Sequence, residues 1–235
     1  MRTPPSTQRA GGRTQRASGR ARRRPLKRAR KIADRLAESY PGTASDLCAL
    51  VHHNPFELLV ATILSARCTD ERVNIVTPSL FARYPTPQDL AAADRDELEA
   101  RIRPAGFFRS KASHLLGASE AIVMRHGGEV PRSMEALTAL PGVGRKTANV
   151  VLSVGFGLPG LPVDTHVTRL SQRLGLTDSA DPVKIEQDLC DLLPREEWGT
   201  LSLRLILHGR SVCSARRPRC DSCELADLCP SRGRF

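Results

Sequence analysis

A lysine at the start of a predicted helix is the first candidate for chemistry. Lys146 follows the turn Pro141-Gly142-Val143-Gly144 and precedes the apolar residues Val150 to Leu152. Glycines permit backbone angles that other residues resist, and free N–H groups at the start of a helix form an anion site. The positive helix end and the neighbouring Arg145 disfavour the charged ammonium, and a neutral amine is a nucleophile. The alternative is a helix corner with a surface lysine.

Four of the seven cysteines form the second candidate site. Their spacing is six, two and five residues, at Cys213, Cys220, Cys223 and Cys229. Clustered thiolates suit either tetrahedral Zn²⁺, the commoner structural case, or an iron–sulfur cluster. An odd cysteine count with such clustering argues against a disulfide framework. The remaining cysteines are expected to be small buried hydrophobic residues, namely Cys48, Cys68 and Cys190.

These groups, in this order, resemble the endonuclease III family of helix-hairpin-helix DNA glycosylases. Leu140–Leu152 matches the family's hairpin, and Lys146 matches its catalytic lysine. Eighteen residues further on, Val163-Asp-Thr-His-Val167 places Asp164 at the position of the catalytic aspartate. The cysteine spacing matches the family's iron–sulfur ligands. The resemblance covers residues 29 to 231, and three motifs in the right order are far more specific than any one alone.

The resemblance implies an all-α fold of two lobes with the substrate cleft between them. One lobe is a six-helix barrel, about residues 48–158, that carries the hairpin. The other contains the cluster and combines residues 29–47 with 159–235. The family's cofactor is a [4Fe–4S] cluster, here held by the four cysteines. Its partner is double-stranded DNA with a damaged base or an abasic site, and the protein is expected to be a monomer.

The resemblance also implies how the two catalytic residues act. Lys146 would attack the sugar C1′, expel an oxidised pyrimidine and leave an iminium, after which β-elimination breaks the strand. Asp164 would stabilise the cationic sugar or accept a proton. Asp164 is also a good N-cap for a helix that starts there, and both roles are compatible. His166 also matches a family position, where a structural role is expected.

Further residues are expected to contact DNA. A buried base must be flipped out of the duplex before its sugar is attacked, and a protein group fills the gap. The family positions for this task carry Arg67 and Phe107, where related chains commonly have Gln at the first. Phosphate contacts are expected from the hairpin turn and from the loop between the first two cysteines: Gly142, Val143, Gly144, Arg145, Arg216, Arg217 and Arg219. The alternatives are an exposed arginine, a buried Phe and a solvated basic loop.

Helices must position these groups, because no stretch alternates with a period of two. N-cap residues mark several helix starts, at Asn54, Thr86, Asp94 and Asp181. Helical patterns are expected over 30–40, 56–66, 69–84 with a break or kink at Pro78, 110–126, 134–140, 145–152, 164–174 and 198–211.

Composition limits the class of protein. The chain has 235 residues, of which 40% are hydrophobic, enough for a core. No apolar run approaches the ~20 residues of a membrane span, and no signal-peptide pattern is present, so an intracellular location without a membrane is expected. The net charge is +11, and residues 1–31 hold 12 Arg and Lys without one acidic residue. Residues 1–28 are expected to be disordered, binding phosphate non-specifically or only solvated.

Two other functions stay open on the residues alone. A monofunctional glycosylase of the same fold would remove a base without cutting the strand, and Lys146 argues against it. A non-catalytic helix-hairpin-helix module with structural zinc belongs to a different class. The colour of the purified protein and a strand-nicking assay separate these possibilities.

Overall fold

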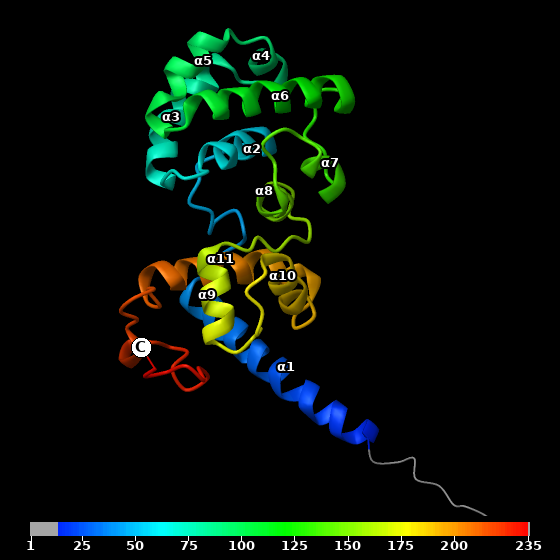
Figure 1. Ribbon diagram of the computed structural model, residues 1–235, viewed down its shortest axis with the longest axis vertical. Helices are drawn as coiled ribbons and strands as arrows, with labels where there is room; N and C mark the ends of the chain where they lie inside the picture. Colours follow the sequence, from blue (N-terminus) through cyan, green and yellow to red (C-terminus); the bar gives the residue numbers. More distant parts are fainter. Residues whose placement is uncertain (1–13, 235) are drawn as a thin grey trace, which may run out of the picture.

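The protein is almost entirely helical. The computed structural model describes the backbone of residues 14–234 and the side chains of residues 26–234. Within this part of the chain every regular element is a helix, and no strand occurs, which confirms the all-α prediction (Figure 1). None of the described helices is long and apolar enough to span a bilayer.

The middle of the chain forms the upper body in Figure 1. Its elements follow one another in sequence: α2 Pro55–Leu64, α3 Asp70–Arg83, α4 Pro87–Ala91, α5 Arg95–Ile102, the 3₁₀-helix η1 Arg103–Ala105, α6 Phe108–His126, α7 Met134–Thr138, α8 Arg145–Val150 and the π-helix η2 Val151–Gly155. They enclose one hydrophobic core that runs from Leu50 to Leu152. The apolar α2 is central, since eight of its ten residues are buried.

The two ends of the chain build the lower body together. Its helices are α1 Thr14–Ser39, α9 Thr165–Arg173, α10 Pro182–Cys190, η3 Arg195–Glu197, α11 Trp198–Ser211 and η4 Cys220–Ser222. A second core joins Ile32 and Leu36 of α1 to residues between Leu161 and Leu225. Arg35 of α1 donates a hydrogen bond of 2.7 Å to the backbone oxygen of Glu224 and pairs with Asp227.

A small third cluster connects the two bodies. It contains Leu58 of α2, Val150 and Val154 from the α8–η2 segment, and Leu203 of α11. The helix that begins at the hairpin turn therefore ends in the junction between the two cores.

Most predicted helix starts are confirmed. Asn54 accepts a hydrogen bond from Glu57 N, and Thr86 and Asp89 form a reciprocal capping box. Asp94 and Asp181 are simple N-caps, which accept hydrogen bonds from Glu97 N and Lys184 N. At Pro78 a break or kink was predicted; the break is wrong, because α3 runs from Asp70 to Arg83, and the kink stays a prediction. A proline removes only one backbone N–H donor from the helix, and the buried residues of α3 keep the helix in place against the core.

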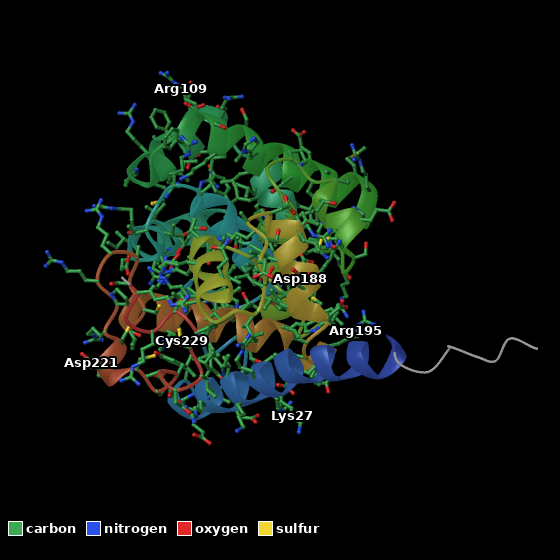
Figure 2. All side chains as sticks on the ribbon, turned by 60° about the horizontal axis from the view of Figure 1, so that its bottom comes forward. Lys27, Arg109, Asp188, Arg195, Asp221 and Cys229 are labelled. Atoms are coloured by element: carbon green, nitrogen blue, oxygen red, sulfur yellow. The ribbon has the colours of Figure 1, made fainter. Side chains whose placement is uncertain are left out.

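The first helix starts earlier than predicted. Helix α1 begins at Thr14 and not near Arg30, and residues 1–13 lie outside the described part, so the disorder expected for residues 1–28 stays a prediction. Arginine and alanine are good helix formers, and they extend the helix beyond its buried end. That end includes Arg28, which donates to Gly175 O, and the buried Ala29. Lys27 projects from the outer side of α1 (Figure 2).

Candidate functional site

The hairpin turn between α7 and α8 requires a glycine at position 142 but has room for a side chain at position 144. Gly142 has φ +77°, and a Cβ there would lie 2.6 Å from the Cβ of His114. Val143 points into the core and is 5% exposed. At Gly144 an added Cβ would meet nothing within 4 Å, and α8 starts there without a side-chain cap. The turn therefore presents an open surface at the start of α8, where no capping side chain accepts hydrogen bonds from the backbone N–H groups.

Lys146 and Asp164 come together in one pocket between the two bodies. Lys146 is the second residue of α8, and Asp164 immediately precedes α9. The pocket is also lined by Asp70 and Arg210, together with apolar residues of both bodies. Lys146 is exposed, so its amine is accessible from outside. The structure thus places an amine and a carboxylate in the lining of one pocket.

Asp164 is an N-cap, as its position before α9 predicts. Its Oδ1 accepts hydrogen bonds from His166 N and Val167 N, both 2.8 Å long. Both hydrogen bonds of the cap go to Oδ1, and Oδ2 takes no part in them. Capping and a chemical role are therefore compatible on this side chain.

His166 packs inside the lower body. Its Nδ1 lies 3.1 Å from Arg169 Nη2, and that guanidinium also donates to Gly209 O at 2.9 Å. Burial lowers the pKa of His166. These contacts join α9 to α11 and agree with the expected structural role.

An ion pair at the pocket was not predicted. Arg210 of α11 donates to Asp70 of α3 at 2.8 Å, across 140 residues of sequence. Asp70 marks the start of α3 in the sequence, but no local pattern indicates its partner. The pair connects the two bodies beside Lys146 and Asp164.

Arg145 of the hairpin is held by a carboxylate. Its Nε and Nη2 donate to the two oxygens of Glu186 on α10, at 2.7 and 2.8 Å. The Glu186 side chain is 11% exposed, and the hydrogen bond to it raises the pKa of Arg145. The pair fixes the hairpin to the lower body, so two guanidinium nitrogens are already committed. A phosphate contact by Arg145 stays a prediction.

Breaking this pair from its two ends should have unequal effects. Arg145→Met leaves a buried carboxylate unpaired, which we expect to lower the free energy of unfolding by roughly 1–3 kcal/mol. Glu186→Gln removes the charge and leaves only an exposed guanidinium, so its effect should be smaller. Urea unfolding of both variants measures the difference. A larger loss for Glu186→Gln would contradict the asymmetry.

Arg67 and Phe107 meet at the surface of the upper body. They are the only non-glycine residues with positive φ in the described chain, at 55° and 50°. The left-handed region disfavours ordinary side chains by about 1–2 kcal/mol per residue. The Arg67 Cζ lies 5.4 Å from the centre of the Phe107 ring. Phe107 is 61% exposed. Two strained loops thus present one cation and one aromatic ring side by side, and the alternative of a buried Phe is wrong.

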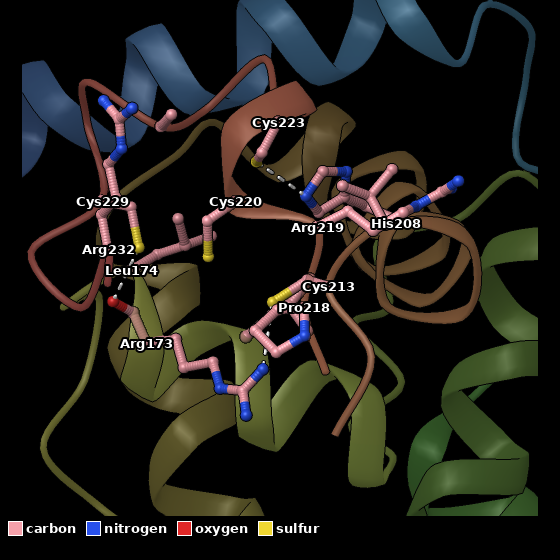
Figure 3. A pocket seen from close by; sticks show the side chains of 13 residues that line it. Arg173, Leu174, His208, Cys213, Pro218, Arg219, Cys220, Cys223, Cys229 and Arg232 are labelled. Atoms are coloured by element: carbon pink, nitrogen blue, oxygen red, sulfur yellow. Dashed lines mark hydrogen bonds between the residues drawn. The ribbon is translucent and has the colours of Figure 1, made fainter. Parts of the chain in front are cut away.

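The four cysteines line one cavity of the lower body (Figure 3). Their sulfur atoms face a space that Leu170, Leu174 and Ala226 border with apolar groups. None of the cysteines in the described chain forms a disulfide. Arg173 donates to Cys213 Sγ at 3.3 Å, and Leu225 N donates to Cys223 Sγ at 3.4 Å. Four convergent sulfurs in an apolar shell with N–H donors fit an iron–sulfur cluster.

His208 belongs to this region and was missed in the sequence. Its Nε2 lies 3.4 Å from Cys223 Sγ (Figure 3). Its Nδ1 lies 3.2 Å from Glu224 Oε1. The residue is 1% exposed, and burial lowers its pKa. Burial also raises the pKa of Cys223 to about 11. A bound cation is the group that stabilises such a thiolate.

The arginines of the cysteine loop and the three other cysteines differ in their burial and contacts. Arg216 and Arg217 are exposed on the loop between the first two cysteines. Arg219 donates to the backbone oxygen of Ser211, so its guanidinium helps to hold this loop. Cys48, Cys68 and Cys190 were expected to be buried, and the structure shows them half-buried against the cores.

Comparison with known proteins agrees with this architecture. Residues 60–195 match the model of the HhH-GPD superfamily base excision DNA repair protein, and residues 213–229 match the iron–sulfur binding domain of endonuclease III. The second match begins at Cys213 and ends at Cys229. The two matches cover the hairpin and the cysteine cavity in turn.

Relatives of similar length were found. Endonuclease III of a Synechocystis species is 56% identical over 206 residues, covering 87% of this chain and 93% of the relative. Endonuclease III of Bacillus subtilis is 46% identical, covering 87% and 92%.

Solved structures have the same fold. A non-covalent endonuclease III–DNA complex superimposes with a TM-score of 0.82 at 44% identity, covering 89% of this chain and 97% of that one. A thermostable thymine-DNA glycosylase, at 22% identity and a TM-score of 0.77, shares the fold. Family models, relatives and structures thus agree, and the chain belongs to the endonuclease III family of the HhH-GPD superfamily.

Proposed function

We propose that this protein is a bifunctional DNA glycosylase and abasic-site lyase that removes oxidised pyrimidines in base excision repair. The observation that supports this most is that Lys146 and Asp164 line the same pocket. Lys146 lies two residues after Gly144, the last residue of the open hairpin turn. A trapped endonuclease III–DNA covalent intermediate is among the solved structures of the same fold, at 44% identity. An amine nucleophile accounts for both base removal and strand cleavage.

The chemistry needs few groups. Lys146 Nζ forms a bond to C1′ of the damaged nucleoside while the C1′–N bond breaks, the base leaves with the electron pair and the amine loses a proton. The C1′–O4′ bond of the resulting aminal then breaks, with a proton going to O4′, and leaves an iminium. The iminium acidifies the C2′ proton, and loss of that proton breaks the C3′–O bond and expels the 3′ phosphate. Asp164 Oδ2 stabilises positive charge on the sugar or accepts a proton from the amine. The Asp70–Arg210 pair keeps the two bodies in place around these atoms.

DNA is positioned by groups outside the pocket. The turn at Gly142, Val143 and Gly144 receives one phosphate, assisted by Arg145. The exposed arginines of the cysteine loop contact others, and Arg219 acts chiefly by ordering that loop. Arg67 and Phe107 enter the gap left by the flipped nucleotide. The partner is double-stranded DNA with a damaged base or abasic site, bound by a monomer in the cytoplasm, at the bacterial nucleoid.

The cofactor is a [4Fe–4S] cluster held by Cys213, Cys220, Cys223 and Cys229. When bound it supplies four Fe–S bonds that fix the C-terminal segment. Arg173 and Leu225 N stabilise the ligand sulfurs through hydrogen bonds. The upper and lower bodies are the barrel lobe of about residues 48–158 and the cluster lobe of about 29–47 and 159–235.

Duplexes with a single lesion test the function. The protein is incubated with DNA that carries either one oxidised pyrimidine or one abasic site. Bifunctional activity releases the base and gives a strand broken 3′ to the lesion without heat or alkali. Base release with an intact strand would identify a monofunctional glycosylase. Binding without base release would identify a non-catalytic module.

Arg67 should influence which base is tolerated opposite the lesion. A guanidinium has donors and no acceptor, so it suits guanine, whose O6 and N7 accept. A good bidentate contact discriminates by about 1–3 kcal/mol, so excision should be faster opposite G than opposite A. Arg67→Gln should reduce this ratio, because an amide offers both donor and acceptor.

The measurement is single-turnover excision of one oxidised pyrimidine opposite each of the four bases. Arg109→Gln is the matched control, since Arg109 is also an exposed arginine of this region, with a side chain 82% exposed (Figure 2). Identical profiles for wild type and Arg67→Gln would place the opposite-base contact elsewhere, with Phe107 the next candidate.

A further inference from the structure

Lys111 is a buried cation far from the proposed nucleophile. It lies in the first turn of α6 and is 3% exposed. Burial lowers the pKa of its ammonium. A buried lysine requires partners, because an unpaired charge is strongly disfavoured in an apolar interior. Neither the hairpin nor the pocket with Asp164 uses this residue.

The partners of Lys111 are two backbone oxygens from different loops. Its Nζ donates to Leu64 O at 2.7 Å and to Ala105 O at 2.9 Å. Leu64 is the last residue of α2, where carbonyl groups lack partners within the helix and attract a cation. Ala105 is the last residue of η1. One side chain therefore ties together the ends of two helices that are 41 residues apart in sequence.

Each of these ends leads directly to a strained residue. Arg67 follows Leu64 by three residues, and Phe107 follows Ala105 by two. Both have positive φ, and a left-handed backbone in such residues persists only where the surroundings hold it. Arg67 and Phe107 also touch each other, with 5.4 Å between Cζ and the ring centre. Lys111 thus lies beneath both loops and fixes the distance between them.

We propose that Lys111 is a positioning residue that sets the Arg67–Phe107 pair in the geometry needed to fill the gap beside a flipped nucleotide. The inference rests on the proposed function, since it assumes that this pair enters damaged DNA. Lys111 acts through the two loops and touches no substrate atom. Its loss leaves both loops attached but lets their spacing vary, so the pair meets the duplex in many arrangements.

A double-mutant cycle tests this coupling. The variants are Lys111→Met, Phe107→Ala and the two combined, with Lys184→Met as a control for replacing an exposed lysine, whose side chain is 59% exposed. Affinity is measured for a duplex with a tetrahydrofuran abasic analogue and for the undamaged duplex. This analogue cannot form a Schiff base, so the result does not depend on Lys146. A second readout is the fluorescence of 2-aminopurine placed opposite the analogue, which reports unstacking of that base.

Lys111→Met should reduce the preference for the abasic-analogue duplex over the undamaged duplex by roughly tenfold. The double variant should lose little more of this preference than Phe107→Ala alone, because the effects of residues that act as a unit are non-additive. The 2-aminopurine signal should fall in both single variants and stay unchanged with Lys184→Met. Independent losses that multiply, or an unchanged 2-aminopurine signal, would overturn the proposal. If Lys111→Met does not fold, Lys111→Gln enters the same cycle, since its amide can still donate to one carbonyl. Failure of wild type to cut abasic DNA would instead overturn the proposed function.

Discussion

Lys146→Gln should abolish the covalent adduct that borohydride traps between the protein and abasic DNA. The glutamine side chain is close to lysine in length but has no amine to condense with the sugar aldehyde, so no iminium is available for reduction. Loss of a nucleophile typically lowers a rate by roughly 10⁴-fold or more, and strand cleavage should fall accordingly. Duplex binding should fall far less, because the hairpin turn and the exposed arginines remain.

The matched control is Lys184→Gln. Lys184 lies on α10, pairs with Asp188 at 3.0 Å and is exposed to solvent. Its replacement removes one lysine without touching the pocket, so adduct formation should equal that of wild type. An undiminished adduct with Lys146→Gln, measured by the shift of labelled DNA in a denaturing gel, would mean that another amine is the nucleophile.

Cys223→Ser should remove most of the cluster and leave poorly soluble protein. A serine oxygen is a much weaker ligand than a thiolate for iron–sulfur iron, so iron should fall well below the about four atoms per chain of a filled [4Fe–4S] site. Among the described residues after Cys213, the only regular element is the 3₁₀-helix η4, and Leu225 is the only fully buried apolar residue in the second core. Metal binding therefore supplies much of its folding free energy.

Cys190→Ser is the appropriate control for this experiment. Cys190 packs against the same core, does not line the cavity, and burial raises its pKa to about 12. The control should keep the yellow-brown absorbance and full iron content. Iron and zinc are measured by atomic emission on protein purified with and without air. Zinc at one atom per chain, with no iron, would contradict the cofactor assignment.

Sequence patterns predict those parts of the fold that depend on near neighbours. An N-cap needs only the next three residues, which is why Asn54 and Asp181 are located correctly. The cysteines are recognised for the same reason, since their spacing is itself the signal. The end of a helix with mixed composition is harder, and α1 begins far before the predicted residue because strong helix formers continue it.

The contacts that complete the site have no local signal. Arg145 meets Glu186 across 41 residues, and Arg210 meets Asp70 across 140. Each is a surface-type residue in the sequence, and only tertiary folding gives it a buried or paired position. The left-handed backbone of Phe107 is a similar case, since an aromatic residue has no intrinsic preference for it. Such a conformation is imposed by surroundings that a single sequence does not reveal.

The pairing of α1 with the C-terminal segment has a consequence for biosynthesis. Arg35 bonds to a residue 189 positions later, so α1 leaves the ribosome long before its partner exists. The upper body can fold during translation, because its core lies within one continuous stretch. The lower body, in contrast, has to wait until the segment around Glu224 has been synthesised and has left the ribosome, and its high sequence separation makes closure slow. Until then α1 exposes Ile32 and Leu36, so this interval is when the newborn chain depends most on chaperones and on timely delivery of iron and sulfide.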